Sequence, residues 1–249
     1  MNYTRRELGT TLLAGLSLSP FLPAGAIDSV VSGVQLGVQT YSFHDVTQGG
    51  MEAVDLIVKH MTKLGLGMCE LFSPDIEPFP LPWFAVDAWK PGAANGSGPA
   101  GDVNAATRKY AALAKALAKA PETLKQREVL RNWRLSIPLS YFTGVAKKFS
   151  DAGIKICCFN LSFDDSYSDD EIERGFEMAK ALGTNIITAS TDLPTAKRLV
   201  PFLEKHRLYV AVHGHSDAKN PTAFSSPPTF AAALKLSKYF KVNLDIGLY

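Results

Sequence analysis

An α/β fold with a parallel sheet is the architecture that this sequence predicts, and three of its features indicate it. Short β-rich runs recur along the chain, and each is followed by a segment with helical periodicity. The spacing between runs suits right-handed crossovers that join parallel strands. The chain has 249 residues, of which 46% are hydrophobic and 20% charged, so it is long enough for one large domain with its own core.

Six β-rich runs are the predicted strands, and five segments between or after them are the predicted helices. In residues 51–64, apolar side chains at Val54, Ile57, Met61 and Leu64 form the stripe of an amphipathic helix. The strands are expected at residues 34–43, 67–72, 154–163, 185–190, 208–213 and 242–247. The other helices are expected at residues 141–152, 171–182, 195–206 and 230–240.

Two local signals mark where helices begin. Ser168 and Glu171 have the spacing of a capping box, in which each side chain accepts a hydrogen bond from the backbone of the other residue. Pro227 and Pro228 precede the last predicted helix, where the first turn tolerates proline.

A proline-rich and glycine-rich insertion at residues 74–100 interrupts the alternation and predicts a long loop. Such loops lie at the substrate-binding end of a β/α barrel, so Trp83, Phe84 and Trp89 could stack against a sugar, with Trp83 and Trp89 as the substrate-binding candidates. The alternative is that these aromatic side chains only hold the loop against the domain. Residues 102–120 predict a surface helix.

The N-terminus resembles an export signal. Arg5 and Arg6 precede an apolar run at residues 8–22 and a small-residue site ending at Ala26, which is typical of a twin-arginine signal peptide over residues 1–26. The run is too short and too rich in glycine, serine and proline for a stable membrane span. We therefore expect a mature domain at residues 27–249, located in the periplasm or secreted; the alternative is an uncleaved helix or anchor.

The charge balance argues against nucleic acid as a partner. Without Arg5, Arg6 and Glu7 the chain keeps 24 basic and 23 acidic residues, and these are interspersed on the predicted helices.

The three cysteines do not predict a disulfide framework. Cys69, Cys157 and Cys158 all lie in strand-like runs, and their number is odd. Neighbours on a strand point to opposite faces, so Cys157 and Cys158 are not expected to bind one metal together.

Polar side chains occur near the end of each predicted strand, where active sites of parallel α/β folds gather. Glu70 is a candidate general base or acceptor for a sugar hydroxyl group, although an ion pair is an equally good structural explanation. Asn160 is a candidate substrate-binding residue. The other strand-end side chains are Gln39, Tyr41, His44, Ser162, Ser190, Thr191, His213, His215 and Asp245.

His213 and His215 are the sharpest of these features. Residues two apart on a strand point to the same face, so both imidazoles could reach one metal or substrate. The alternative is a pair of structural loop histidines. Asp245 is expected inside a strand, where a carboxylate needs an ion pair or a metal.

Six segments together resemble the sugar phosphate isomerase/epimerase family. They are 131–136 (RNWRLS), 158–163 (CFNLSF), 175–183 (GFEMAKALG), 187–190 (ITAS), 213–216 (HGHS) and 244–247 (LDIG). The resemblance implies a xylose isomerase-like TIM barrel, of the (β/α) type, with about six of its eight strands present and its C-terminal part missing.

The resemblance also implies a chemistry. In the wider superfamily carboxylates and histidines hold a divalent metal (Mn, Mg or Zn), which would make His213 and Asp245 metal ligands, and Glu70 and His215 catalytic residues. The implied reaction is isomerisation or epimerisation of a sugar or sugar derivative by proton abstraction next to a carbonyl, so the resemblance implies a small-molecule carbohydrate as the ligand. A 3-keto-glycoside lyase or hydratase and a non-catalytic carbohydrate-binding barrel are the alternatives, the second favoured by Leu248 where related motifs usually have a histidine.

Overall fold

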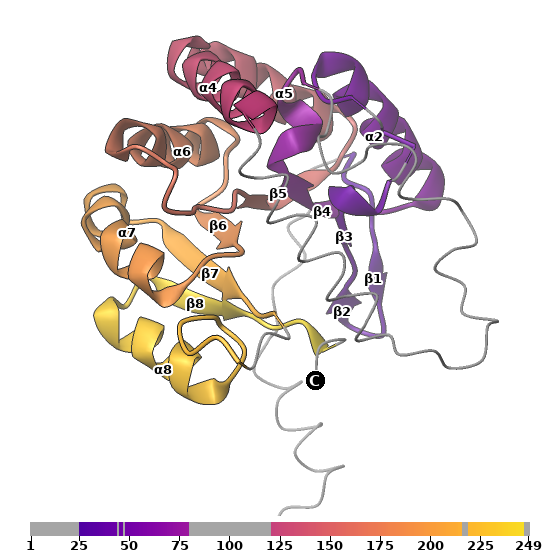
Figure 1. Cartoon of the computed structure of the whole chain (residues 1–249). Coiled ribbons are helices and arrows are strands. Elements are labelled where there is room, and N and C mark those ends of the chain that lie inside the picture. Colours follow the sequence, from indigo (N-terminus) through magenta and orange to yellow (C-terminus); the bar gives the residue numbers. More distant parts are fainter. Residues whose placement is uncertain (1–24, 44, 47, 80–120, 216–218, 247–249) are drawn as a thin grey trace, which may run out of the picture.

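A six-stranded parallel sheet forms the centre of the computed structural model, which describes residues 25–43, 45–46, 48–79, 121–215 and 219–246 (Figure 1). Every strand in this sheet pairs in parallel with the next strand along the chain, in the order β3-β4-β5-β6-β7-β8. The strands are β3 (Val38–Gln39), β4 (Met68–Phe72), β5 (Lys155–Asn160), β6 (Ile186–Ala189), β7 (Tyr209–His213) and β8 (Phe240–Asn243). This order is that of a (β/α) barrel and confirms the predicted fold class; β3 and β8 are the edges of the described sheet.

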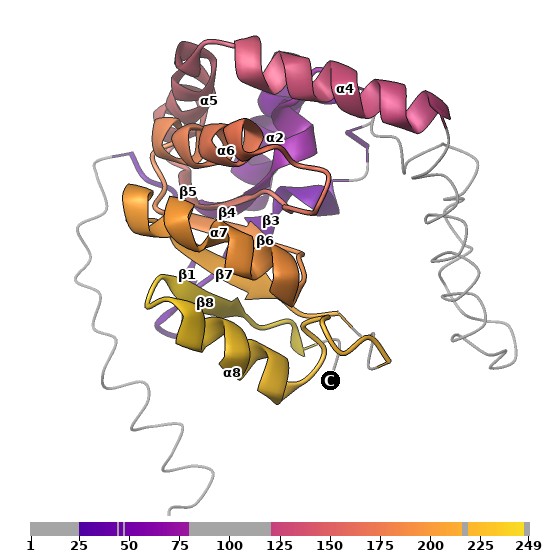
Figure 2. The same cartoon turned by 60° about the vertical axis from the view of Figure 1, so that its left-hand side comes forward.

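Helices cover one side of this sheet, as Figure 1 shows, and in Figure 2 α4 extends next to α6 in the same layer. The helices are α2 (Met51–Leu64), α4 (Pro121–Ser136), α5 (Leu139–Asp151), α6 (Asp169–Ala181), α7 (Leu193–His206) and α8 (Pro227–Leu236). Two short 3-10 turns follow strands, η1 (Thr40–Ser42) after β3 and η2 (Ser73–Ile76) after β4. No helix of the described residues is long and apolar enough to cross a membrane.

The two faces of the sheet differ in chemistry. Under the helices the side chains are apolar and fully buried, as at Ile187, Ala189, Val210 and Val212. Alternation places the intervening residues on the other face, which we call the inner face, and the strand registers identify its members. They include Gln39, Glu70, Cys158, Asn160, Thr188, Ala211, His213 and Asn243.

The predicted first strand is largely wrong. Residues 34–43 divide into β2 (Val34–Gln35), which forms an antiparallel hairpin with β1 (Val30–Val31), and β3, which alone joins the parallel sheet. Ser32 and Gly33 link β1 to β2 with positive φ angles of 52° and 81°, the backbone of a tight hairpin turn.

The last predicted strand is displaced as well. It is β8, which ends at Asn243, so Asp245 lies beyond the strand and not inside it as expected. Helix α4 was not predicted from the sequence.

The predicted capping box is confirmed, whereas the last predicted helix, 230–240, is displaced and spans Pro227–Leu236. Ser168 Oγ accepts a hydrogen bond from the Glu171 backbone N–H at 3.2 Å, and the Glu171 carboxylate accepts one from the Ser168 N–H at 3.4 Å. Pro227 opens α8. Of the predicted signal peptide only Gly25 and Ala26 belong to the described residues.

The two adjacent cysteines do not point apart. Cys69 pairs with Ile156 and Glu70 pairs with Cys158, so Cys157 is an extra residue, a β-bulge, in β5. A bulge breaks the alternation of side chains. The Sγ atoms of Cys157 and Cys158 are consequently only 3.3 Å apart, which corrects the prediction of opposite faces.

Two helical glycines should respond to alanine with opposite signs. A Cβ atom at Gly175 in α6 would lie 2.6 Å from Leu161 Cδ2, whereas at Gly144 in α5 its nearest neighbour would be Met51 Cε at 3.6 Å. We expect Gly175→Ala to lower the free energy of unfolding by about 1–3 kcal/mol through overpacking. Gly144→Ala should raise it by about 0.5–1 kcal/mol, because alanine is the better helix former. Urea unfolding of both variants checks this; changes of the same sign would contradict it.

Candidate functional site

Glu70 lies at the centre of a hydrogen-bond network on the inner face. Its Oε1 atom accepts three hydrogen bonds, each from a different strand. The donors are Gln39 Nε2 at 2.8 Å, Asn160 Nδ2 at 2.8 Å and Thr188 Oγ1 at 2.6 Å. Asn160 and Thr188 are buried, while Glu70 and Gln39 are half-buried. All three donors are neutral, so the network orients the carboxylate without neutralising its charge.

The second carboxylate oxygen of Glu70, Oε2, receives no hydrogen bond from any described residue, and the side chain is half-buried. A carboxylate with one oxygen fixed and the other available has the form of a positioned general base.

A cavity of about 170 Å³ lies beside this network, at the carboxyl ends of β4 and β5. Asn160 belongs to both, because it lines the cavity and donates to Glu70. The other residues that line the cavity are Phe72, Ser73, Pro74, Glu77, Phe79, Leu130, Arg134, Ser162 and Tyr167.

A buried ion pair forms part of the cavity wall. Arg134 Nε donates to Glu77 Oε1 at 2.7 Å, and Arg134 Nη1 donates to the Tyr167 hydroxyl group at 2.7 Å. Burial of Arg134 opposes its charge, but the Glu77 carboxylate outweighs this and raises the pKa of Arg134. Burial also raises the pKa of Tyr167. The wall therefore offers fixed polar groups with little net charge.

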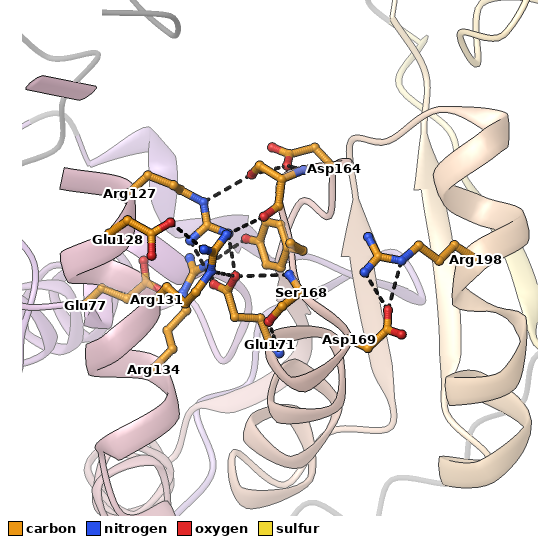
Figure 3. Close-up of polar contacts among 12 residues, drawn as sticks. Glu77, Arg127, Glu128, Arg131, Arg134, Asp164, Ser168, Asp169, Glu171 and Arg198 are labelled. Atoms are coloured by element: carbon orange, nitrogen blue, oxygen red, sulfur yellow. Dashed lines mark hydrogen bonds and ion pairs between the residues drawn. The ribbon is translucent and has the colours of Figure 1, made fainter. Parts of the chain in front are cut away.

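Arginines of α4 hold this wall in place (Figure 3). Glu171, at the start of α6, accepts from Arg127 Nη1 at 2.8 Å and from Arg131 Nε at 2.8 Å, and its carboxylate lies 3.6 Å from Arg134 Nη1. Burial alone would raise the pKa of Glu171, but hydrogen bonds from Arg127 and Arg131 outweigh it and hold the pKa below its ordinary value.

A second polar group lies at the ends of β7 and β8. The rings of His213 and His215 are in edge-to-face contact, with centroids 5.0 Å apart, and His213 Nε2 is 3.9 Å from Asp245 Oδ2. Desolvation and the neighbouring His213 lower the pKa of His215. This lowering favours the neutral imidazole, which can accept a proton or donate a hydrogen bond.

A complete metal site is not present among the described residues. A catalytic zinc ion ordinarily has three protein ligands. No three His, Cys, Asp or Glu side chains within the described ranges are placed to hold one ion. His213 and Asp245 thus supply two potential metal ligands, and a bound metal ion stays a prediction.

The structure gathers the predicted site residues into two groups. Glu70 and Asn160 form one group, and His213, His215 and Asp245 form the other. Strands β5 and β6 lie between β4 and β7, a separation of three strand spacings or about 14 Å along the sheet. The remaining candidates, Trp83 and Trp89, lie outside the described residues, as do Phe84, His44 and Leu248.

Four further residues of the site were not predicted from the sequence: Thr188, Glu77, Arg134 and Tyr167. Thr188 lies two residues before Ser190, one of the strand-end candidates. Including the residue two positions before each strand end among the candidates would have identified it. Glu77 and Arg134 are 57 residues apart, and no local signal connects them.

A buried acid lies below the carboxyl end of β4. Asp75 is 2% exposed, and its Oδ2 atom has no hydrogen-bond partner among the described residues. Burial raises the pKa of Asp75 to about 6, against a hydrogen bond with Thr40 that lowers it.

Comparisons with known proteins give a distant likeness. No family model matches the chain, and no curated protein matches it. Among solved structures, an uncharacterized protein from Parabacteroides distasonis is 17% identical, with a TM-score of 0.45 over 81% of this chain and 58% of that one. The probable 3-DHS dehydratase AsbF, involved in petrobactin synthesis, from Bacillus anthracis is 15% identical, with a TM-score of 0.45 over 85% of this chain and 63% of that one.

A sugar phosphate isomerase/epimerase from Parabacteroides distasonis is 15% identical, with a TM-score of 0.44 over 88% of this chain and 70% of that one. The chain thus spans 58–70% of the length of these three proteins. Likenesses this distant say nothing about activity, which has to be argued from the site.

Proposed function

We propose that this chain belongs to an enzyme that removes a proton from a carbon next to a carbonyl group of a sugar or sugar-like polyol, with Glu70 as the base. The observation that supports this most is the geometry of Glu70. Three neutral donors fix its Oε1, while no described residue donates to Oε2. A base with a fixed orientation and a retained charge is what proton abstraction requires.

The surroundings of Glu70 suit a polyhydroxylated substrate. Beyond their hydrogen bonds to Glu70, the amides of Gln39 and Asn160 each keep one N–H donor and a carbonyl acceptor, and Thr188 Oγ1 can still accept, so these groups can bind sugar hydroxyl groups. The cavity of about 170 Å³ is smaller than the roughly 300–1,000 Å³ of sites for drug-sized ligands, so it fits a molecule of a few carbon atoms.

Glu70 can itself return the proton to the neighbouring carbon, which would give an isomer. His215 lies with His213 and Asp245 about three strand spacings away along the sheet, so it has no part in this step. Since the described residues bring only His213 and Asp245 together as metal ligands, a divalent metal at this place remains part of the proposal, and the role of Glu70 does not depend on it.

Two other functions are distinguished by their products. A lyase acting on 3-keto-glycosides would begin with the same proton abstraction but would then expel the glycosidic oxygen as the leaving group, and a hydratase would add water to the double bond so formed. A carbohydrate-binding barrel would bind the sugar without any exchange of its protons.

Glu70→Gln should abolish the proton transfer. We would incubate the full chain in D₂O with aldoses, ketoses and 3-keto-glycosides, and follow deuterium incorporation at carbon by NMR. Glutamine can still accept the three hydrogen bonds but cannot take a proton, so we expect exchange to fall roughly 10²–10⁴-fold.

Asp151→Asn is the matched control, because it also neutralises a carboxylate, but in an exposed ion pair with Lys147 on α5. It should leave the exchange rate unchanged. Undiminished exchange in a folded Glu70→Gln variant would rule out Glu70 as the base, and sugar binding without exchange in the wild type would favour the carbohydrate-binding barrel.

A further inference from the structure

The adjacent thiols of Cys157 and Cys158 form a pair that the proposed activity does not use. Their Sγ atoms are 3.3 Å apart because the bulge in β5 turns both side chains toward one side. In a regular strand successive side chains point to opposite faces, and the two sulfurs could not meet. The local backbone therefore presents two thiols in a fixed, close arrangement.

Both thiols of the pair are partly exposed. Cys158 is in register with Glu70 and shares the inner face with it, and both cysteines are half-buried. Cys69, the remaining cysteine of the chain, is fully buried, and this burial raises its pKa. An incoming reagent thus has access to the pair, while Cys69 is unreactive.

The two thiols are unequal in acidity. The hydrogen bond with Cys158 lowers the pKa of Cys157, and the same hydrogen bond raises the pKa of Cys158. A hydrogen bond between the two sulfurs thus favours loss of one thiol proton, and the second thiol is held beside the first thiolate.

We propose that Cys157 and Cys158 are a vicinal-dithiol site that captures monosubstituted trivalent arsenicals and electrophiles of the same thiophilic class. The arsenic atom of such a compound carries one organic group and needs two more bonds, which two sulfurs provide. Zinc, in contrast, needs further ligands, and no third one is placed to join the pair among the described residues.

The reaction is balanced without an oxidant. With an organoarsenic(III) oxide, the arsenic–oxygen bonds break and two arsenic–sulfur bonds form. The two thiol protons leave with the oxygen as one water molecule, and the oxidation state of arsenic and sulfur is unchanged.

Closure to a disulfide is the less favourable fate of the pair. Consecutive Cα atoms are about 3.8 Å apart, below the usual disulfide range of about 4.4–6.8 Å. Bridging by a larger atom avoids drawing the sulfurs from 3.3 Å to the bonding distance.

The test is titration of the reduced full chain with phenylarsine oxide, followed by intact-mass analysis. We expect one adduct per chain, with the mass of the reagent less one water, removed by a dithiol such as 2,3-dimercaptopropanol but not by a monothiol. Cys157→Ser and Cys158→Ser should each weaken binding roughly a hundredfold, because a single sulfur loses the second, intramolecular bond.

Cys69→Ser is the matched control and should leave the adduct unchanged. Each variant is checked for folding by urea unfolding, and serine differs from cysteine by one atom. An adduct that survives Cys158→Ser, or a wild-type pair that closes to a disulfide and takes up no arsenic, would overturn the proposal. The adduct is read from mass alone, so the result does not depend on any sugar-processing activity.

Discussion

Glu171→Gln should lower the free energy of unfolding by about 3–5 kcal/mol, because it removes the buried carboxylate that pairs with both Arg127 and Arg131. The Glu171 side chain is fully buried, and those of Arg127 and Arg131 are 19% and 24% exposed. Glutamine can still complete the capping box with Ser168, so the change isolates the loss of charge. The difference in the free energy of unfolding is measured by urea unfolding, with wild type and variant fitted to the same dependence on urea concentration.

Glu128→Gln is the matched control on the same cluster. Glu128 pairs with Arg131 three residues later, but its side chain is 57% exposed. Solvent screens such a pair, so this variant should lose less than about 1 kcal/mol. Equal losses in the two variants would show that burial does not set the strength of these ion pairs.

Asp75→Asn should make the protein more stable at pH 8 and leave it nearly unchanged at pH 4. Burial raises the pKa of Asp75 from 3.8 to about 6, so the folded state binds this proton more tightly than the unfolded state. Stability therefore falls as the pH rises from about 4 to 6, and the loss is complete above pH 6. A shift of this size corresponds to about 3 kcal/mol.

The difference between wild type and variant, measured by urea unfolding from pH 4 to pH 8, isolates Asp75 from all other titrating groups. Asp151→Asn on exposed α5 provides the control, and its difference from wild type should stay within about 0.5 kcal/mol over the same range. A flat difference for Asp75→Asn as well would mean that its carboxyl group ionises as easily in the folded as in the unfolded state.

The elements that the sequence predicted correctly are those set by local chemistry. The helix at residues 51–64 has the predicted bounds, because its apolar stripe is regular and Gly65 ends it with a φ of 68°. The parallel alternation followed from the same periodicity. In contrast, α4 was missed because charged residues dominate it, and its arginines bind Glu171 some 40 residues away.

The bounds and registers of the strands depend on pairing with neighbouring strands, and a local sequence pattern holds no information on that pairing. The bulge at Cys157 exists because β4 and β5 change register between Cys69 and Glu70. The role of Glu70 as a strand-end acid was predicted, but its three donors come from three other strands and only the folded sheet brings them together. The division of the candidate residues into two groups likewise follows from strand order.

The contacts of Glu171 also indicate the order in which α6 and α4 fold. Its carboxylate accepts from Ser168, three residues away, and from Arg131, 40 residues away. The local contact closes a short loop and can form as soon as α6 nucleates, whereas the distant one costs more chain entropy. The first turn of α6 thus prepares the acceptor onto which α4 docks, and amide hydrogens of α4 should exchange by openings that leave α6 protected.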